Sequence, residues 1–410
     1  MKILFVVGRH AYGDPARGEG YEYANMLPAL RSLGHEVVHF ESFERSVHGD
    51  FAALNAAFID ALEGERPDLV LCVLMAYELW TETLDLARSS FPATIVNWGT
   101  DDSWKYAQFA RHIAPHVDCH ATTWAAARDR AQRDGQRNWV LTQWAANDAI
   151  LAAPLPAREC GRRVSFIGAA YGNRRRWIGA LRTAGIDVEC FGHGWPNGAI
   201  AAAEVPRIIR DSLISLNFAD SGIHWRGVVP YRSRQIKARV FEVPGAGGFL
   251  LTQPADQLDR YYRPGEEIVA FDSVEQLIER IRHFLAHPEE RDRIAAAGHA
   301  RTRREHTYSR RLERLLDEAT RLGRREAQGR AGADASHVRQ VLASLAQAHR
   351  PGPWLNALRA ALVFPLRLVW GEQRGPRAAR RLLYELSWRL AGAKTYGASG
   401  WPGRLFYRES

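Results

Sequence analysis

The chain has 410 residues, which is enough for two domains or more, and 46% of them are hydrophobic. No uninterrupted apolar run is long enough to predict a membrane-spanning helix. The opening MKILFVVGRH becomes polar too soon for a secretory signal, and the four cysteines show no CxxC spacing. These features argue against a disulfide-framed or zinc-ribbon protein and predict a cytoplasmic one.

The net charge of +9 is concentrated near the C-terminal end of the chain. Residues 351–410 contain ten Lys or Arg and three Glu, a surplus of seven positive charges. The rest of the chain is therefore nearly balanced in charge, and we expect no nucleic-acid partner.

The first part of the chain alternates short apolar runs with helical patterns. The apolar runs lie at residues 2–7, 36–40, 69–74 and 93–97 and continue through HVDCHATT and NWVLTQW. The helical patterns between them end at Gly34 and Gly64, where glycine can adopt the left-handed conformation that closes a helix. Continuous apolar strands that alternate with helices predict a parallel sheet covered on both faces.

Two prolines, a glycine and mixed charges at residues 152–163 predict a linker, after which the alternation resumes. Further apolar runs lie at 164–168, 187–192, 213–218, 247–252 and 267–271. We therefore expect an α/β protein with two Rossmann-like doubly wound domains facing a cleft, followed by a helical basic tail. The predicted ranges are 1–155 and 160–322 for the domains, 323–350 for a linker and 351–410 for the tail.

The loop after the first strand, GRHAYGDPARGEGYEY, is long and lacks GxGxxG, and no Walker sequence is present. NAD and ATP chemistry are therefore not favoured. The chain also lacks a DxD motif and a Cys/His cluster, so we expect no metal and no cofactor. Within this loop, His10 is a candidate catalytic residue, although a capping or packing role fits it equally well.

Asp101 and Asp102 follow the strand at 93–97, in the segment VNWGTDDSWKY. A carboxylate at a strand end is well placed to take a proton from an acceptor hydroxyl, so both residues are candidate catalytic groups. The structural alternative is an N-cap for the helix that begins near Ser103, and one of the two is expected to have that role.

Asn173, Arg174 and Arg175 follow the strand at 164–168 and begin a helix, with Asn173 at the expected N-cap position. Cations in the first turn of a helix oppose its dipole, which is understandable if an anion docks there. The structural alternative is a solvated basic turn.

The segment KARVFEVPGAGGFLLTQ places Arg239 and Glu242 three residues apart, on one face of a short helix. Pro244 is expected to end that helix, and Gly247 lets the next strand begin tightly. The pair is either a salt bridge beneath the sheet or a carboxylate that grips a diol, with cations near a diphosphate. A sugar nucleotide carries both groups.

The segments SFIGAAYGNRR, CFGHGW and RVFEVPGAGGFLLT resemble those of the CgeB-type (spore-maturation-protein-B-like) glycosyltransferases. VNWGTDDSWKY and VLTQWAAND resemble segments of the first domain of that family. The likeness covers residues 1–320 and implies the two-domain GT-B fold, with a nucleotide sugar bound by the second domain and no bound metal.

The resemblance also implies roles for individual residues. Glu242 would hold the ribose hydroxyls, and Arg174 or Arg175, with Lys237 or Arg239, would contact the diphosphate. The acceptor would enter through the first domain, past Gly13 and the two aspartates. Where the broader group often carries an acid that contacts the donor sugar, this chain has Arg234.

We therefore expect a glycosyltransferase that moves a sugar from a nucleoside-diphosphate donor to a glycan, lipid-linked or other hydroxyl, in surface polysaccharide synthesis. The alternatives are a nucleotide-sugar epimerase and a non-catalytic two-lobed sugar- or nucleotide-binding protein. The tail at 351–410 combines Leu and Trp with many Arg, which suits the anionic inner face of the plasma membrane. Packing of the tail on its own protein, or on a second subunit, is the alternative.

Overall fold

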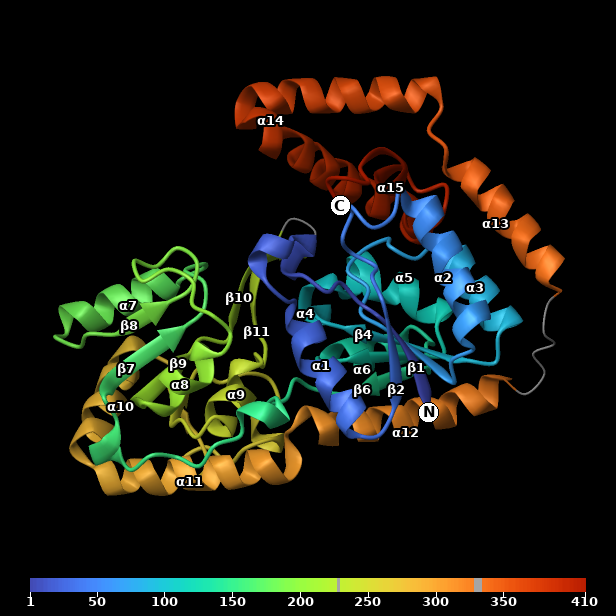
Figure 1. The fold of residues 1–410 in the computed structure, drawn as a ribbon. Helices are drawn as coiled ribbons and strands as arrows, with labels where there is room; N and C mark the ends of the chain where they lie inside the picture. The colour runs from blue at the N-terminus through green and yellow to red at the C-terminus, as the bar shows by residue number, and fades with distance from the viewer. Residues whose placement is uncertain (227–228, 328–333) are drawn as a thin grey trace. The chain divides into compact units, whose positions relative to one another are not determined.

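The computed structural model describes residues 1–226, 229–327 and 334–410. Contacts between residues divide the chain into two compact units. The first unit combines Met1–Thr142 with Arg314–Ser410, and the second unit is Gln143–Glu313 (Figure 1). The end of the chain therefore belongs to the same unit as its beginning.

A six-stranded parallel sheet forms the centre of the first unit. Its strands are β1 (Lys2–Val6), β2 (Glu36–Phe40), β3 (Leu69–Cys72), β4 (Thr94–Gly99), β5 (Cys119–Thr122) and β6 (Trp139–Leu141). The order is β2-β1-β3-β4-β5-β6, so the direction of winding reverses between β1 and β3. Such a switch point opens space at the carboxyl ends of the strands, where sheets of this kind place their ligands.

Helices connect these strands and supply the residues that cover them. They are α1 (Tyr21–Ser32), α2 (Phe51–Glu65), α3 (Thr81–Ser90), α4 (Asp102–Lys105), α5 (Arg111–Ile113) and α6 (Ala125–Arg133). Every residue of β3 is buried, and Val70 shares a core with Phe58 of α2. Burial on both faces explains why the strands read as unbroken apolar runs.

The two predicted helix ends have different outcomes. Gly34 adopts the left-handed conformation after α1, with φ of +79°, as predicted. Gly64 does not close α2, because the helix continues to Glu65 and Arg66 takes the left-handed position instead, with φ of 47°. Pro67 follows Arg66, and its ring does not allow the helix to continue.

The second unit contains a five-stranded parallel sheet. Its strands are β7 (Arg162–Ile167), β8 (Glu189–Phe191), β9 (Ser212–Asn217), β12 (Leu250–Thr252) and β13 (Val269–Ala270). The order is β13-β12-β9-β7-β8, which again reverses direction, here between β7 and β9. The helices of the unit are α7 (Arg174–Thr183), α8 (Glu204–Arg210), α9 (Arg239–Gly245), α10 (Val274–Ala286) and α11 (Pro288–Glu305).

An antiparallel ribbon in the second unit was not expected from the sequence. β10 (Asp220–Arg226) and β11 (Val229–Arg234) pair with each other and lie in the chain between β9 and α9. The ribbon connects the carboxyl end of β9 to the start of α9.

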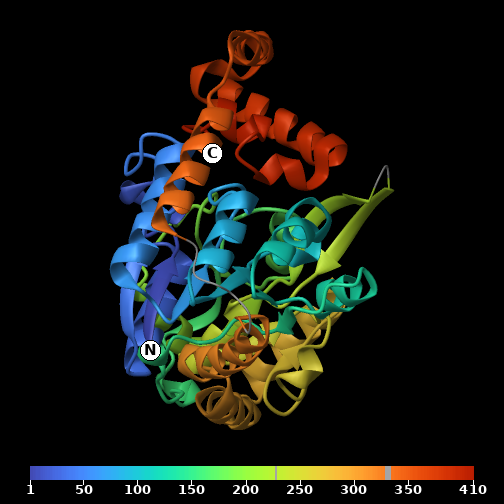
Figure 2. The same cartoon turned by 90° about the vertical axis from the view of Figure 1, so that its right-hand side faces the viewer.

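The tail at 351–410 is helical, as expected, and belongs to the first unit (Figure 2). It contains α14 (Pro353–Ala391) and α15 (Trp401–Leu405), and it follows α12 (Tyr308–Ala327) and α13 (Ala335–His349). Val338 of α13 and Tyr396 belong to the core of the first unit. In the part of the chain that the structure describes, no helix has the length and apolar character needed to cross a membrane.

Candidate functional site

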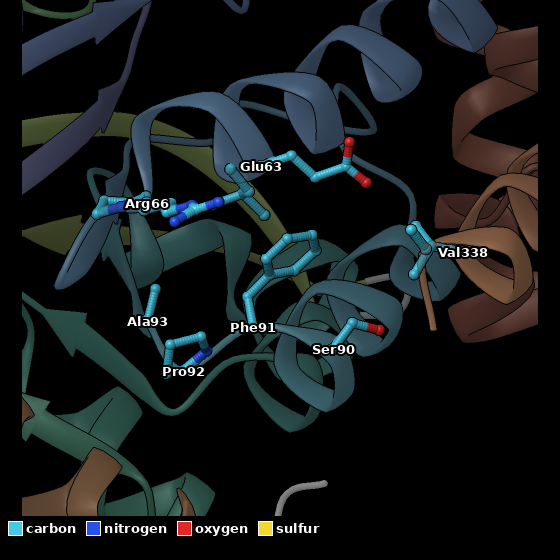
Figure 3. Close-up of a pocket in the computed structure, with 10 residues that line it drawn as sticks. Glu63, Arg66, Ser90, Phe91, Pro92, Ala93 and Val338 are labelled. Carbon is cyan, nitrogen blue, oxygen red and sulfur yellow. The ribbon is translucent and has the colours of Figure 1, made fainter. Parts of the chain in front are cut away.

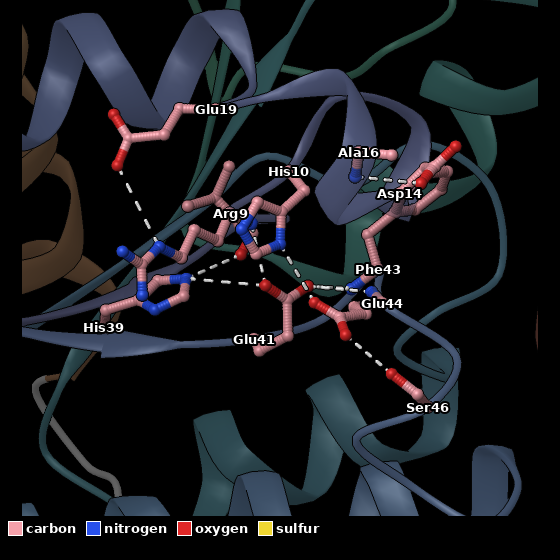
Figure 4. A network of polar contacts seen from close by, with 11 residues as sticks. Arg9, His10, Asp14, Ala16, Glu19, His39, Glu41, Phe43, Glu44 and Ser46 are labelled. Carbon is pink, nitrogen blue, oxygen red and sulfur yellow. Dashed lines mark hydrogen bonds and ion pairs between the residues drawn. The ribbon is translucent and has the colours of Figure 1, made fainter.

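The loop after β1 places His10 beside Glu44, which follows β2 (Figure 4). The distance from His10 Nδ1 to Glu44 Oε2 is 3.0 Å, and both side chains are about one-fifth exposed. Among the described residues, no hydrogen bond to Nε2 of His10 is found. A carboxylate that holds one imidazole nitrogen and leaves the other available is the arrangement used for general-base catalysis.

The carboxylate of Glu44 is itself held in place. The hydroxyl of Ser46 donates to Glu44 Oε1 at 2.6 Å, and this bond, followed by the one from His10, holds the pKa of the Glu44 carboxyl below its ordinary value. Glu41 organises the same loop, because its Oε1 accepts the backbone N–H groups of Phe43 and Glu44. Glu41 Oε2 accepts the N–H of Arg9 at 2.7 Å, which joins the two loops.

Glycines allow the loop after β1 to lie directly on the loop after β2. A Cβ at Gly8 would stand 2.7 Å from the Cβ of Phe43, and one at Gly13, which has φ of +67°, would stand 3.0 Å from the Phe43 carbonyl oxygen. Beside Gly13, Tyr12 also adopts a left-handed conformation, with φ of 59°, and its side chain is 81% exposed. An exposed aromatic ring on a strained loop at the carboxyl edge suits contact with a ligand rather than packing.

Asp102 lies in the first unit as predicted, but its carboxylate is enclosed. Only 1% of Asp102 is exposed, and its Oδ2 lies 3.1 Å from Nε2 of the fully buried His120. His120 Nδ1 contacts the amide of Asn97 at 3.2 Å, and Asn97 in turn accepts the N–H of Leu74. This chain of buried polar groups ties β4, β5 and the segment after β3 together. A base must reach the acceptor hydroxyl, so the burial of Asp102 argues against the catalytic role predicted for it.

Asp102→Ala should lower the free energy of unfolding by about 1–3 kcal/mol, because the Nε2–H of His120 would remain buried without an acceptor. Urea denaturation of the variant and of Asp101→Ala measures this, since Asp101 is only half-buried and should change stability little. If Asp102→Ala has normal stability but a large loss of turnover, the result would instead support a catalytic role for Asp102.

Asp101 occupies the N-cap position of α4 through its backbone, since its carbonyl accepts the N–H groups of Trp104 and Lys105. Its side chain makes no capping hydrogen bond. Glu22, in the first turn of α1, is close enough for their charges to interact. Burial raises the pKa of the Glu22 carboxyl, the charge of Asp101 adds to the effect, and Lys105 opposes it. Glu22 was not among the residues predicted from the sequence.

In the second unit, the predicted pairing of Arg239 with Glu242 is confirmed. Both lie on α9, and Nη1 of Arg239 is 3.2 Å from Oε2 of Glu242. The side chains keep 20% and 12% of their surface exposed, so neither is sealed beneath the sheet. The helix ends at Gly245, one residue after Pro244.

Arg174 begins α7 and brings a second cation near Arg239. It is buried, and its guanidinium donates to the Ala169 carbonyl at 2.9 Å and to the Tyr171 hydroxyl at 3.0 Å. Burial lowers the pKa of the Arg174 guanidinium, and the positive charge of Arg239 lowers it further. The charge of Asp220 acts on Arg174 in the opposite direction, and Glu242 pairs with Arg239, so nearby carboxylates partly offset the repulsion between the two guanidinium groups.

The residues beside Arg174 differ in their exposure and contacts. Asn173 stands at the N-cap position of α7 but makes no capping hydrogen bond, and its buried Oδ1 has no partner among the described residues. Arg175 is exposed and donates to the Gly194 carbonyl at 2.6 Å. Lys237 is half-buried and lies just before α9. Arg174 is therefore the residue of its turn that the structure holds most firmly toward Arg239.

Close packing explains why a glycine stands at position 247. It adopts φ of +80°, and a Cβ there would stand 2.6 Å from the Ala152 carbonyl oxygen and 2.9 Å from Ala153. The conformation of Gly247 is therefore explained by the close approach of residues 152–153. Nothing in its surroundings requires the donor-binding role that was predicted.

A pocket of about 340 Å³ in the first unit is lined by none of these residues (Figure 3). Residues from the end of α2, the end of α3 and the start of α13 line it, including Glu63, Arg66, Phe91 and Val338. Glu63 and Arg66 precede β3 and Phe91 precedes β4, so the pocket is at the amino edge of the sheet. In the described part of the chain, no group of three or more His, Cys, Asp or Glu is arranged to hold a metal ion.

Residues 170–317 match the model of a family described as glycosyl transferase-like. This range includes α7, the ribbon and α9, and therefore the Arg174, Arg239 and Glu242 side chains. No curated protein matches the chain.

Several solved structures share the fold. Sucrose-phosphate synthase from Thermosynechococcus elongatus aligns over 78% of this chain and 99% of its own, with 14% identity and a TM-score of 0.55. Anabaena HepE in complex with UDP and glucose aligns over 77% and 98%, with 11% identity and a TM-score of 0.52. A glycosyltransferase from Rickettsia africae aligns over 78% and 98%, with 10% identity and a TM-score of 0.54. The expected α/β fold with two parallel sheets is confirmed.

Proposed function

We propose that this protein is a glycosyltransferase of the CgeB type, which moves a sugar from a nucleoside-diphosphate sugar to a hydroxyl of a glycan or lipid-linked acceptor. The observation that carries the proposal is the trio of Arg174, Arg239 and Glu242 at the carboxyl edge of the second sheet. The match of residues 170–317 to a glycosyl transferase-like family supports it. The similarity to Anabaena HepE, which was solved with UDP and glucose, favours a UDP-sugar donor.

In the proposed donor site, the three side chains bind different parts of the nucleotide. The guanidinium groups of Arg174 and Arg239 neutralise the diphosphate, whose negative charge increases as its bond to the sugar breaks. Glu242 accepts hydrogen bonds from the two ribose hydroxyls. Cations supply the stabilisation of the leaving group, so the proposal needs no metal ion.

On the first unit, the proposal assigns the acceptor to the loop after β1. His10, oriented by Glu44, takes the proton of the acceptor hydroxyl while the hydroxyl oxygen bonds to the anomeric carbon. Tyr12, next to Gly13, offers an exposed aromatic ring for a sugar in this loop. Asp101, with Glu22 nearby, is proposed to orient the acceptor.

The biological setting belongs to the same proposal. We place the enzyme in surface polysaccharide synthesis, in the cytoplasm and at the inner face of the plasma membrane. The basic residues at 351–410 are the part of the chain proposed to make that contact.

Titration of the protein with UDP, GDP and dTDP, followed by assay of nucleoside-diphosphate release from the matching sugar donors, tests the function. Release that depends on an added glycan acceptor supports transfer. Interconversion of the donor sugar without release would indicate an epimerase, and binding without any turnover would indicate a binding protein. Failure to bind any nucleotide would overturn the proposal.

Glu242→Ala should raise the Kd for UDP about ten- to a hundredfold, because two hydrogen bonds from ribose to a carboxylate are lost. Isothermal titration measures the change. Glu266→Ala is a matched control, since Glu266 also pairs with an arginine three residues earlier, at 3.0 Å, but is 59% exposed. Equal affinity of the two variants would remove Glu242 from the donor site.

A further inference from the structure

The long helix α14 is folded back on itself (Figures 1 and 2). Its two arms meet at Gly371, whose φ of 78° and ψ of 177° lie outside the helical range. Gly375 packs directly on the backbone of Arg367, and a Cβ at this glycine would stand 2.7 Å from that backbone. The arms are therefore in close contact near the bend, which makes the bend a fixed feature of the fold.

One side of α14 is fully used in packing. Leu355 and Val363 of the first arm contact Ala379 and Leu383 of the second, together with Phe406. Residues on either side of α14 dock on the first unit, because Tyr396 and Val338 are part of its core. The position of α14 on the unit is thus set without any contribution from its outer side chains.

The outer side chains at the bend are apolar and exposed. Phe364, Leu368, Val369 and Trp370, which we call the bend patch, are 67%, 75%, 68% and 52% exposed. Residues 368–370 are consecutive, so they point in different directions around the helix and none of them is covered. Exposed apolar residues gathered in this way mark an interaction site.

The charges near the bend patch are almost all positive. The three glutamates of residues 351–410 are each paired with an arginine of the same region, in the pairs Glu372–Arg367, Glu385–Arg389 and Glu409–Arg359. Just after the bend, Arg374, Arg377 and Arg381 are exposed, and none of them pairs with a carboxylate of the described residues. Three exposed arginines without a carboxylate partner among the described residues therefore follow the bend patch along the chain.

We propose that the bend of α14 binds an anionic lipid membrane, with the bend patch inserted among the lipid chains and the three arginines at the headgroups. Tryptophan, leucine and arginine in this combination match the boundary between headgroups and acyl chains. A second copy of the chain is a poorer occupant, because it would bring the same cations together. Nucleic acid would use the arginines but would leave the aliphatic side chains without a partner.

This inference rests on the proposed position of the enzyme at the membrane, and it identifies the surface of the protein that makes the contact. Its test measures lipid binding and not sugar transfer, so either can fail without the other. Removal of the whole C-terminal region is unsuitable, because Tyr396 and Val338 belong to the core of the first unit. Substitutions of exposed side chains avoid that problem.

The experiment is sedimentation of the full chain with phosphatidylcholine vesicles that contain or lack phosphatidylglycerol. We expect binding only to the anionic vesicles, and weaker binding as salt is added. Arg374→Gln/Arg377→Gln/Arg381→Gln should weaken the partition coefficient about a hundredfold. Phe364→Ser/Leu368→Ser/Trp370→Ser should weaken it about tenfold or more.

The control for the charge variant is Arg31→Gln/Arg137→Gln/Arg280→Gln, which removes three exposed arginines elsewhere and should bind like the wild type. A thermal melt of each variant verifies that it is folded. Equal binding by the wild type and both bend variants, or the absence of binding by the wild type, would overturn the proposal. A wild-type dimer in light scattering that the Phe364/Leu368/Trp370 variant converts to monomer would also overturn it, in favour of a second copy.

Discussion

His10→Ala is expected to lower kcat by about 10²–10⁴ while the affinity for the donor nucleotide stays the same. The His10 imidazole follows β1 at the carboxyl edge of the first sheet, is partly exposed, and has a carboxylate partner, Glu44, at 3.0 Å. Steady-state kinetics of the variant, with UDP titration in parallel, measures both quantities.

His116→Ala is the matched control for that measurement. His116 also contacts a carboxylate through Nδ1, that of Asp85 at 2.9 Å, and its side chain is 23% exposed. It lies before β5, at the opposite edge of the sheet, so its loss should leave kcat unchanged. Glu44→Gln should reduce kcat less than His10→Ala, because only the orientation of the ring is affected. A His10→Ala enzyme that turns over within a few-fold of wild type would remove His10 from catalysis.

Arg174→Gln is expected to weaken UDP binding about ten- to a hundredfold and to leave binding of uridine unchanged. The guanidinium is proposed to contact the diphosphate alone, so only a ligand that carries phosphate should respond. Glu242→Ala should weaken both ligands, because the ribose is common to them. Competition titrations of UDP and uridine against each variant separate the two roles.

Arg176→Gln serves as the control for Arg174→Gln, since Arg176 lies in the same turn of α7 but is exposed. Its substitution removes one positive charge from the helix start without removing the buried guanidinium. A loss of UDP affinity in Arg176→Gln as large as that in Arg174→Gln would mean that the general charge of the turn attracts the ligand. In that case no specific role would be left for Arg174.

The class of fold could be predicted from the sequence because it depends on local patterns. Strands buried on both faces must be apolar throughout, as β3 shows, and helices between them must carry an apolar side. The contact of Arg239 with Glu242 was also predictable, since a spacing of three residues places two side chains on one face of a helix. Both conclusions need only the nearest neighbours of a residue along the chain.

The antiparallel ribbon of β10 and β11 and the end of α2 at Arg66 were missed. The apolar pattern used to find strands depends on burial, and β10 and β11 show no such run in the sequence. The helix α2 ends at Glu65, one residue after the glycine that was expected to close it, and Pro67 does not allow it to continue. Glycine permits the left-handed conformation, but the position of the proline decided where it occurs.

The candidate site depended on contacts between distant residues. Asp102 and His10 were both candidate catalytic residues in the sequence, because each follows a strand of the first sheet. Pairing of β4 with β5 places His120 against Asp102 and buries its carboxylate, whereas pairing of β1 with β2 places Glu44 beside His10 and leaves the ring partly exposed. The sequence by itself determined which residue types stand at the strand ends. Only the tertiary structure decided which of them are enclosed and which are accessible, because burial depends on strands that are far apart along the chain.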